Sequence, residues 1–324
     1  MPEAARPPAT APAAAERLLQ RLEWTVIRRL DGLLQGASRT LLRGSGIDLA
    51  DLREYQPHDD VRHIDWNVTA RLATPHVRVF TEDRDMTAWF LLDLSPSVDF
   101  GAPGQAKRDM LAGFVGVLAR LLQRHGNRVG AVLHDGSAAM GRVLPARGGR
   151  RQVLQLLHAL ATGARPSGPA PAPAPGITEL QRLLGGAQGL LRRRSAVFVA
   201  SDFLSAPGWD KPLAHLAQRH DVVAVRLLDP LELTLPDMGL LLLRDPETGE
   251  QLQVDTHERG FRHRFARLAA QREADLRASL AHAGVDTLEL STDEDLLAAL
   301  LRFMQLRGHR PRAAAANPAL AAHG

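Results

Sequence analysis

The chain has 324 residues and 45% of them are apolar, which allows one large domain or two ordinary ones with a sizeable core. Its 40 basic and 36 acidic residues nearly balance, so we expect no nucleic-acid partner, which usually needs a clustered basic patch. There is no cysteine, which excludes disulfides, zinc–thiolate sites and thiol catalysis. No apolar run reaches the roughly 18 residues of a membrane span, and residues 1–15 lack the apolar core of a secretory signal. We therefore expect a cytoplasmic protein.

The composition divides the chain into four segments. Residues 1–15 are rich in proline and alanine and predict a disordered tail. Residues 16–86 begin with leucines at helical spacing over 16–35 and continue into a charged region with few apolar runs, which predicts a helix followed by a small N-terminal subdomain. Residues 87–307 form the regular part of the chain. Residues 308–324 predict a second, alanine-rich tail.

From residue 87 onward, apolar runs typical of buried strands alternate with helical patterns. Strands are predicted over 87–93, 128–135, 139–144, 196–201, 222–228 and 285–290. Helices are predicted over 106–126, 150–163, 209–220, 258–283 and 293–305, with another beginning over 178–184, a hairpin over 240–254 and a Pro/Ala linker over 164–176. This alternation predicts an α/β fold with a mostly parallel sheet covered by helices on both faces. The turn at Asp135-Gly136 predicts one antiparallel edge strand.

Oxygen-bearing side chains directly follow two of these strands. The first strand ends in Asp93, with Ser95 and Ser97 at alternate positions after it, and the fourth strand is followed by Asp202. Alternate side chains of an extended chain point the same way, and ligands of such sheets bind at the carboxyl ends of the strands. We therefore expect these groups to converge, together with Thr178, which follows the linker at a helix start. Hard oxygen donors suit Mg²⁺ or Mn²⁺ and leave a coordination position for a partner's carboxylate.

This pattern resembles the metal-ion-dependent adhesion site of von Willebrand factor A domains. That site has DxSxS after the first strand, a threonine in an intermediate loop and an aspartate after the fourth strand, in the order found here. The resemblance implies a von Willebrand factor A-like (Rossmann-like) fold whose metal binds a partner rather than catalysing a reaction. The alternative is that Ser95, Ser97 and Asp202 only cap the segments that follow them.

A second cluster lies upstream, where residues 52–66 read LREYQPHDDVRHIDW and are followed by Ala70-Arg71. It resembles the signature REYxxGDDxRxIDWxxxAR of the bacterial family called domain of unknown function 58. The matching positions include Arg53, Glu54, Tyr55, Asp60, Arg62, Asp65, Trp66 and Arg71. One departure is His58, where the family usually has glycine. The resemblance implies an adaptor that works with a MoxR-type AAA+ ATPase in chaperone-like assembly or maturation of client proteins.

The signature cluster has two interpretations. Its alternating arginines and carboxylates form either a salt-bridge network that stabilises a subdomain with little apolar core, or a docking face for the ATPase. Tyr55 and Trp66 would anchor a core in the first case and an interface in the second.

An enzyme is the main alternative to a binding protein. Phosphatases of the haloacid dehalogenase type need Asp-x-Asp after the strand, but Ser95 occupies the second position here, so the acid is missing. The sequence also has no GxSxG elbow, P-loop or Rossmann glycine fingerprint. We therefore expect no enzymatic activity. A hydrolase that uses the same metal site, or a structural scaffold with an unused site, remains as an alternative.

Overall fold

The computed structural model describes residues 11–22, 26–27, 51–56, 64, 66–79, 86–101, 105–136, 141–163, 180–245 and 249–309. Its centre is a six-stranded sheet in the order β10-β7-β6-β3-β4-β5. The strands are β3 (Thr87–Asp93), β4 (Arg128–His134), β5 (Arg142–Arg147), β6 (Ala196–Ser201), β7 (Asp221–Leu228) and β10 (Asp286–Ser291). Neighbouring strands pair in parallel except β4 and β5, which are antiparallel. The predicted mostly parallel sheet with one antiparallel edge strand is therefore confirmed.

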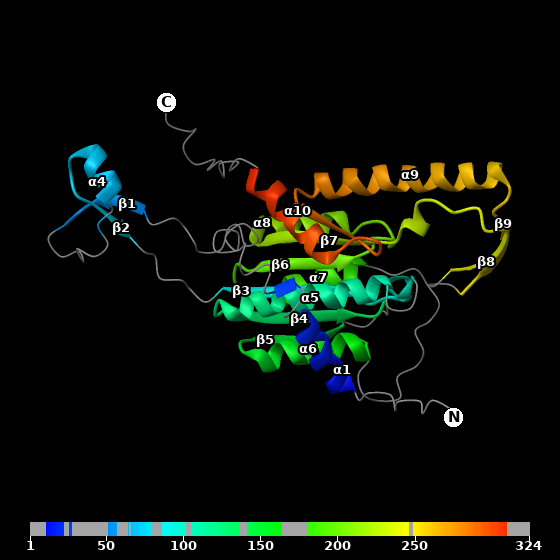
Figure 1. The fold of residues 1–324 in the computed structure, drawn as a ribbon, viewed down its shortest axis with the longest axis horizontal. Coiled ribbons are helices and arrows are strands. Elements are labelled where there is room, and N and C mark those ends of the chain that lie inside the picture. Colours follow the sequence, from blue (N-terminus) through cyan, green and yellow to red (C-terminus); the bar gives the residue numbers. More distant parts are fainter. Residues whose placement is uncertain are drawn as a thin grey trace, which may run out of the picture.

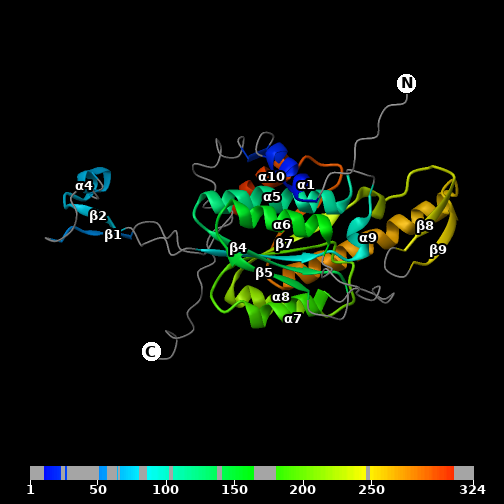
Figure 2. The same cartoon turned by 90° about the horizontal axis from the view of Figure 1, so that it is seen from below.

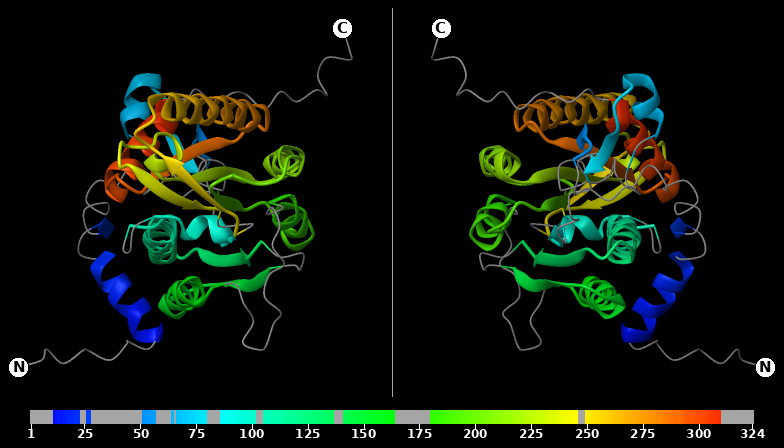
Figure 3. Two further views of the ribbon diagram at one scale, coloured as in Figure 1. Left: turned by 90° about the vertical axis from the view of Figure 1, so that its right-hand side faces the viewer. Right: turned by 90° about the vertical axis from the view of Figure 1, so that its left-hand side faces the viewer.

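Helices cover both faces of the sheet, as Figure 2 shows. One face carries α1 (Ala11–Leu22), α5 (Lys107–Arg124), α6 (Arg150–Thr162) and α10 (Leu296–His309). The other carries α7 (Leu180–Leu190), α8 (Asp210–Arg219) and the C-terminal end of α9 (Arg259–His282). The end-on views of Figure 3 show the resulting three layers. None of the helices in the described part of the chain is long and apolar enough to cross a membrane.

Two apolar cores form because successive side chains of each strand point to opposite faces. In β3, Phe90 and Leu92 face the α5 side, whereas Trp89 and Leu91 face the α7 side. Phe90 stacks on Phe198 of β6 with ring centroids 5.5 Å apart, and Phe114 of α5 meets Phe90 edge-on at 6.5 Å. Burial on both faces explains why the strands are continuous apolar runs rather than alternating ones.

The N-terminal helix α1 differs from its prediction. It begins at Ala11, inside the segment expected to be a disordered tail. Residues 23–25 and 28–35 of the predicted helix lie outside the described residues. Tertiary packing stabilises α1, because Leu19 and Leu22 are buried in the core shared with α5 and α6. Gly116 permits the close approach: a Cβ on Gly116 would stand only 2.7 Å from the Leu22 Cδ1 atom.

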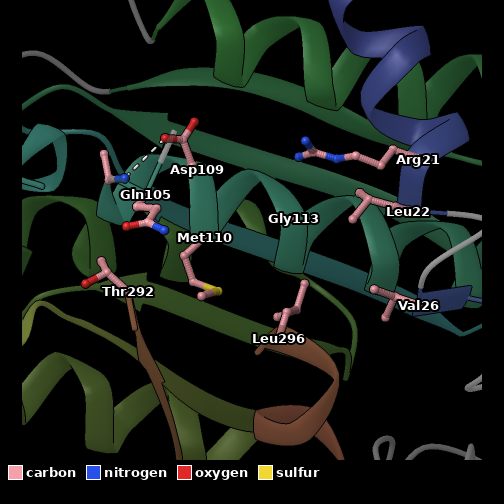
Figure 4. Close-up of a pocket in the computed structure, with 10 residues that line it drawn as sticks. Arg21, Leu22, Val26, Gln105, Asp109, Met110, Gly113, Thr292 and Leu296 are labelled. Atoms are coloured by element: carbon pink, nitrogen blue, oxygen red, sulfur yellow. Dashed lines mark hydrogen bonds between the residues drawn. The ribbon is translucent and has the colours of Figure 1, made fainter. Parts of the chain in front are cut away.

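A small pocket of about 230 Å³ remains where α1, α5 and the start of α10 meet. Figure 4 shows Leu22, Met110 and Leu296 in its walls. Its rim carries Asp109, whose Oδ2 accepts a hydrogen bond from the Ala106 backbone N–H at 3.2 Å. The pocket is a packing gap between three helices, and Thr292, which follows β10, also lines it.

Two further boundaries differ for local reasons. The edge strand β5 begins at Arg142, three residues later than predicted, because Leu133 of β4 pairs with Arg142. Helix α10 begins at Leu296 rather than near residue 293, because Asp295 accepts a hydrogen bond from the Ala298 N–H at 3.2 Å and so caps the helix. The predicted linker over 164–176 and residues 310–324 of the predicted second tail lie outside the described residues.

Two small antiparallel strand pairs lie outside the main sheet. The predicted hairpin over 240–254 is confirmed as β8 (Leu240–Arg244) and β9 (Gln251–Asp255). In Figure 1 it lies beyond the carboxyl ends of β6 and β7, next to the start of α9. The signature region forms an antiparallel pair, β1 (Asp51–Glu54) and β2 (His76–Val79), with α4 (Trp66–Leu72) between them.

Candidate functional site

The oxygen-bearing residues after β3 and β6 meet at one edge of the sheet. Asp93 is the last residue of β3, Ser201 is the last residue of β6, and Asp202 follows it. The two strands are parallel neighbours in a register that pairs Leu92 with Ala200, so Asp93 and Ser201 end level with each other. The Ser201 Oγ donates a hydrogen bond to the Asp93 Oδ2 at 2.7 Å. The predicted neighbour Asp202 lies close enough for its carboxylate to act on the charge of Asp93.

The loop after β3 brings both serines of the DxSxS motif inward. The Ser95 N–H donates to the Asp93 Oδ1 at 3.0 Å, and the Ser95 and Ser97 hydroxyl oxygens lie 3.1 Å apart. Both side chains are buried. Ser95 precedes the short 3-10 helix Pro96–Asp99, but its hydroxyl makes no capping bond to that helix. The capping interpretation is therefore wrong for Ser95, and its hydroxyl is turned toward its motif partner Ser97.

Asp202 combines a capping role with an ion pair. Its Oδ1 accepts a hydrogen bond from the Leu204 N–H at 3.0 Å, so the capping interpretation holds for this oxygen. The turn that follows is tight, since Phe203 has a backbone φ of 59°, a conformation that few non-glycine residues adopt. Packing of the Phe203 ring against Trp209, with centroids 5.1 Å apart, stabilises this turn.

Sequence reasoning missed the most buried charge at this edge, Lys107. Its side chain is 0% exposed, and its Nζ lies 2.8 Å from the Asp202 Oδ2 and 2.6 Å from the Glu232 Oε1. Glu232 belongs to the short 3-10 helix η4 (Pro230–Glu232) after β7. A signal was present in the sequence: a lysine in the first turn of α5 is poorly placed for the helix dipole, so it needs carboxylate partners elsewhere.

Burial and charge shift the ionisation of these groups in different directions. Burial is the largest influence on Asp93 and, with the neighbouring Asp202 carboxylate, it raises the Asp93 pKa to about 6, although the bonds from Ser201 and Ser95 act against the rise. Burial alone would lower the pKa of Lys107, but Asp202 and Glu232 together raise it above its ordinary value. Burial raises the pKa of Glu232, and Lys107 reduces that rise. Asp93 is thus a buried carboxylate whose charge is poorly compensated.

The donor set suits a hard cation through mixed ligands rather than through a carboxylate cage. Among the residues described, there is no group of three or more His, Asp or Glu side chains that could hold a metal ion. The available donors are the Asp93 and Asp202 carboxylates and the Ser95 and Ser97 hydroxyls, which are oxygen ligands of the type that Mg²⁺ or Mn²⁺ prefers. The fifth predicted ligand, Thr178, lies outside the described residues.

The structure describes only part of the signature cluster. Trp66 opens α4 and is 70% exposed, which is at odds with the core-anchor alternative, and its role stays a prediction. Tyr55 is half-buried, while Glu54 and Arg71 are exposed. Asp60, Arg62, Asp65 and the side chain of Arg53 lie outside the described residues. The choice between a salt-bridge network and a docking face therefore stays a prediction.

We expect Lys107→Met to lower the free energy of unfolding by about 3–5 kcal/mol, because breaking a buried ion pair leaves Asp202 and Glu232 uncompensated. Chemical denaturation measures the loss. The matched control is Lys211→Met, which removes an exposed lysine of α8 and should leave stability nearly unchanged. Equal unfolding free energies for the two variants would show that the buried ammonium is not needed for the fold.

The raised pKa of Asp93 predicts that the free energy of unfolding of the metal-free protein decreases as pH rises. Its ordinary pKa is 3.8, so as pH rises from about 4 to about 6 the unfolded chain releases this proton before the folded protein does, and stability falls. Above that window the free energy of unfolding is lower by about 3 kcal/mol than it is below the window. Asp93→Asn should remove this decrease, so the variant should gain stability relative to wild type across the window in urea titrations with a chelator present. Parallel pH profiles for the two proteins would contradict the prediction.

The chain is similar to proteins that share most of its length. Residues 51–275 match the family model described as protein of unknown function DUF58. Uncharacterised proteins of Mycobacterium tuberculosis and Mycobacterium bovis are each 39% identical over 291 residues, covering 89% of this chain and 88% of theirs.

Two solved structures resemble the fold more distantly. An aerotolerance-related membrane protein from Bacteroides fragilis and the conserved hypothetical protein BatB from Bacteroides thetaiotaomicron each have a TM-score of 0.41 and 13% identity, covering 69% of this chain and 100% of theirs. Likeness at that level carries no argument about function. The sequence match, by contrast, spans the candidate site, the described part of the signature cluster and most of the sheet, and on that ground the chain belongs to the family of proteins of unknown function DUF58.

Proposed function

We propose that the carboxyl edge of the sheet binds Mg²⁺ or Mn²⁺ in the manner of a metal-ion-dependent adhesion site of a von Willebrand factor A-like domain. Asp93, Ser95, Ser97 and Asp202 are the candidate ligands, and Thr178 is a further candidate on sequence grounds alone. The bound metal would hold a carboxylate of a partner protein, so the site works by binding and not by catalysis. That the chain is no enzyme stays a prediction.

The charge of the buried cluster is the observation that supports this proposal. Asp93, Asp202 and Glu232 supply three carboxylates, and Lys107 supplies one ammonium. When all four groups are ionised, two negative charges remain uncompensated. Burial and the Asp202 charge therefore make Asp93 hard to ionise and raise its pKa to about 6. A divalent cation would balance these two charges, and the serine hydroxyls provide neutral oxygen ligands beside them.

The proposed partner is a MoxR-type AAA+ ATPase or the client protein of that ATPase. The resemblance of residues 53–71 to the family signature supports this choice, and so does the open coordination position expected of such a metal. In this proposal the protein is an adaptor in chaperone-like assembly or maturation of client proteins.

One observation favours a second candidate, a scaffold whose metal site is unused. The Lys107 ammonium already occupies the Asp202 Oδ2 at 2.8 Å, so Asp202 has an internal cation in place of a metal. A divalent ion must then bind through the other Asp202 lone pairs or through water. Direct measurement of metal affinity separates the two candidates.

We expect isothermal titration calorimetry to detect Mg²⁺ or Mn²⁺ binding, and Asp93→Asn to weaken it by more than roughly tenfold, since even outer-shell partners of a metal contribute that much. The matched control is Asp99→Asn, an exposed aspartate six residues away that pairs with Arg108. Its affinity should equal that of wild type. Absence of metal binding by the wild-type protein contradicts the proposal, and binding that appears only in Lys107→Met would identify the ammonium as the metal's replacement.

We expect the immobilised protein to retain a purified MoxR-type ATPase from the same genome in Mg²⁺, and Asp93→Asn to lose most of this retention in the same buffer. The variant is needed because a chelator would also remove the Mg²⁺ that the ATPase requires for its nucleotide. Retention that is indifferent to Asp93→Asn and to Asp202→Ala would refute metal-mediated binding. The signature cluster would then be the candidate interface.

A further inference from the structure

A large apolar groove begins at the candidate site and continues under the β8–β9 hairpin. Its volume is about 620 Å³, within the range of pockets that hold ligands. Asp202 and Glu232 belong to its lining, as do Leu231 after β7 and Leu241 and Leu243 of β8. Helix α9 closes the groove with Phe265. The groove is therefore continuous with the carboxyl edge of the sheet.

The surface around this groove exposes an unusual share of the large apolar side chains. Ten are exposed among the described residues, and six of these lie between residues 204 and 252: Leu204, Leu231, Met238, Leu240, Leu242 and Leu252. A soluble surface rarely gathers such side chains without a partner to cover them. In β8 the leucines alternate, so that Leu241 and Leu243 are half-buried while Leu240 and Leu242 stand on the opposite, exposed face.

Leucines occupy both faces of β8, and this arrangement indicates what kind of occupant the groove has. A small molecule in the groove would contact Leu241, Leu242 and Leu243. It would leave Leu240 and Leu252 of the same hairpin in water, because both are exposed and lie outside the lining. A protein segment that lies in the groove and continues over the hairpin would cover both faces. The apolar surface therefore favours a protein partner over a small ligand.

The charges of the groove indicate the chemistry of that segment. Asp202 and Glu232 are held by Lys107, and Glu273 is held by Arg226, whose Nη1 lies 2.5 Å from a Glu273 carboxylate oxygen. The lining also contains Arg244 and Arg272, whose guanidinium groups form no ion pair or hydrogen bond with any residue in the described ranges. Lys107 leaves one of the two negative charges of Asp202 and Glu232 unbalanced. The Arg244 and Arg272 guanidinium groups are the positive charges of the lining without an internal partner, and they suit carboxylates on the partner.

We infer that the groove between the β8–β9 hairpin and α9 is the docking site for an apolar segment of a partner protein with acidic flanks. The aliphatic side chains of the segment fill the groove against Leu241, Leu243 and Phe265. A carboxylate on one flank pairs with Arg244 and Arg272. The inference deepens the proposed function, because the other flank reaches the candidate metal site, but the apolar and arginine contacts do not depend on a metal.

Two labelled synthetic peptides test the inference by fluorescence anisotropy against the whole protein. One has the sequence Glu-Gly-Leu-Leu-Phe-Leu-Gly-Glu, and the other replaces its four apolar residues by serine. We expect the first to bind and the second not to bind. Met238→Glu and Leu242→Glu, both 64% exposed at the groove, should each weaken binding by roughly tenfold or more. Arg272→Glu should weaken it similarly by reversing the rim charge.

Matched controls separate the groove from general effects of charge and apolar surface. Leu306→Glu changes a leucine of α10 that is 66% exposed, and Arg267→Glu reverses an exposed charge of α9 outside the lining. Neither should alter binding. Failure of the apolar peptide to bind, or equal losses in the groove variants and the controls, would overturn the inference. Peptide binding that persists while Mg²⁺ and Mn²⁺ show no affinity supports the groove and contradicts the metal proposal alone.

Discussion

The buried ammonium of Lys107 holds the carboxyl edge of the sheet together. It joins the start of α5 to Asp202 after β6 and to Glu232 after β7, so three segments distant in sequence depend on one charge. Removing two carboxylates and an ammonium from water is costly, and the contacts at 2.8 and 2.6 Å offset that cost only while all three groups are present. The position of Asp202 beside Asp93 therefore follows from Lys107 as much as from the sheet.

This ion cluster also determines the electrostatics available for function. A single ammonium cannot balance the buried carboxylates of Asp93 and Asp202 together with the half-buried carboxylate of Glu232. Asp93 is the group left with hydroxyl and amide partners instead of a cation. The Ser201 hydroxyl and the Ser95 N–H stabilise its charged form, but burial and Asp202 outweigh them. A site of this kind gains from a divalent cation, whereas a fully paired cluster would not.

The carboxyl edge continues into a second kind of surface, apolar and wide. The β8–β9 hairpin adds little to the main sheet, yet it carries four consecutive leucines and forms the wall of a groove that reaches Asp202 and Glu232. A charged centre beside a large apolar surface is the usual composition of a protein-binding site, in which apolar contacts provide affinity and charges provide orientation. The proposed metal and the groove are thus adjacent parts of one face.

The sequence alone determined the fold class, because buried parallel strands must be continuous apolar runs and the intervening helices must repeat every 3.6 residues. It also predicted that Asp93 and the residues after β6 converge, because parallel neighbours end at the same edge. The start of helix α1 was misplaced, since this helix depends on burial of Leu19 and Leu22 and on the missing side chain of Gly116.

Only the tertiary structure decided the role of Lys107, because its two carboxylate partners stand 95 and 125 residues away and no local pattern connects them. The groove depends in the same way on contacts between β8, η4 and α9. Residue types and periodicity specify which elements form, whereas the pairing of buried charges and the shape of a cavity are set by contacts between distant segments.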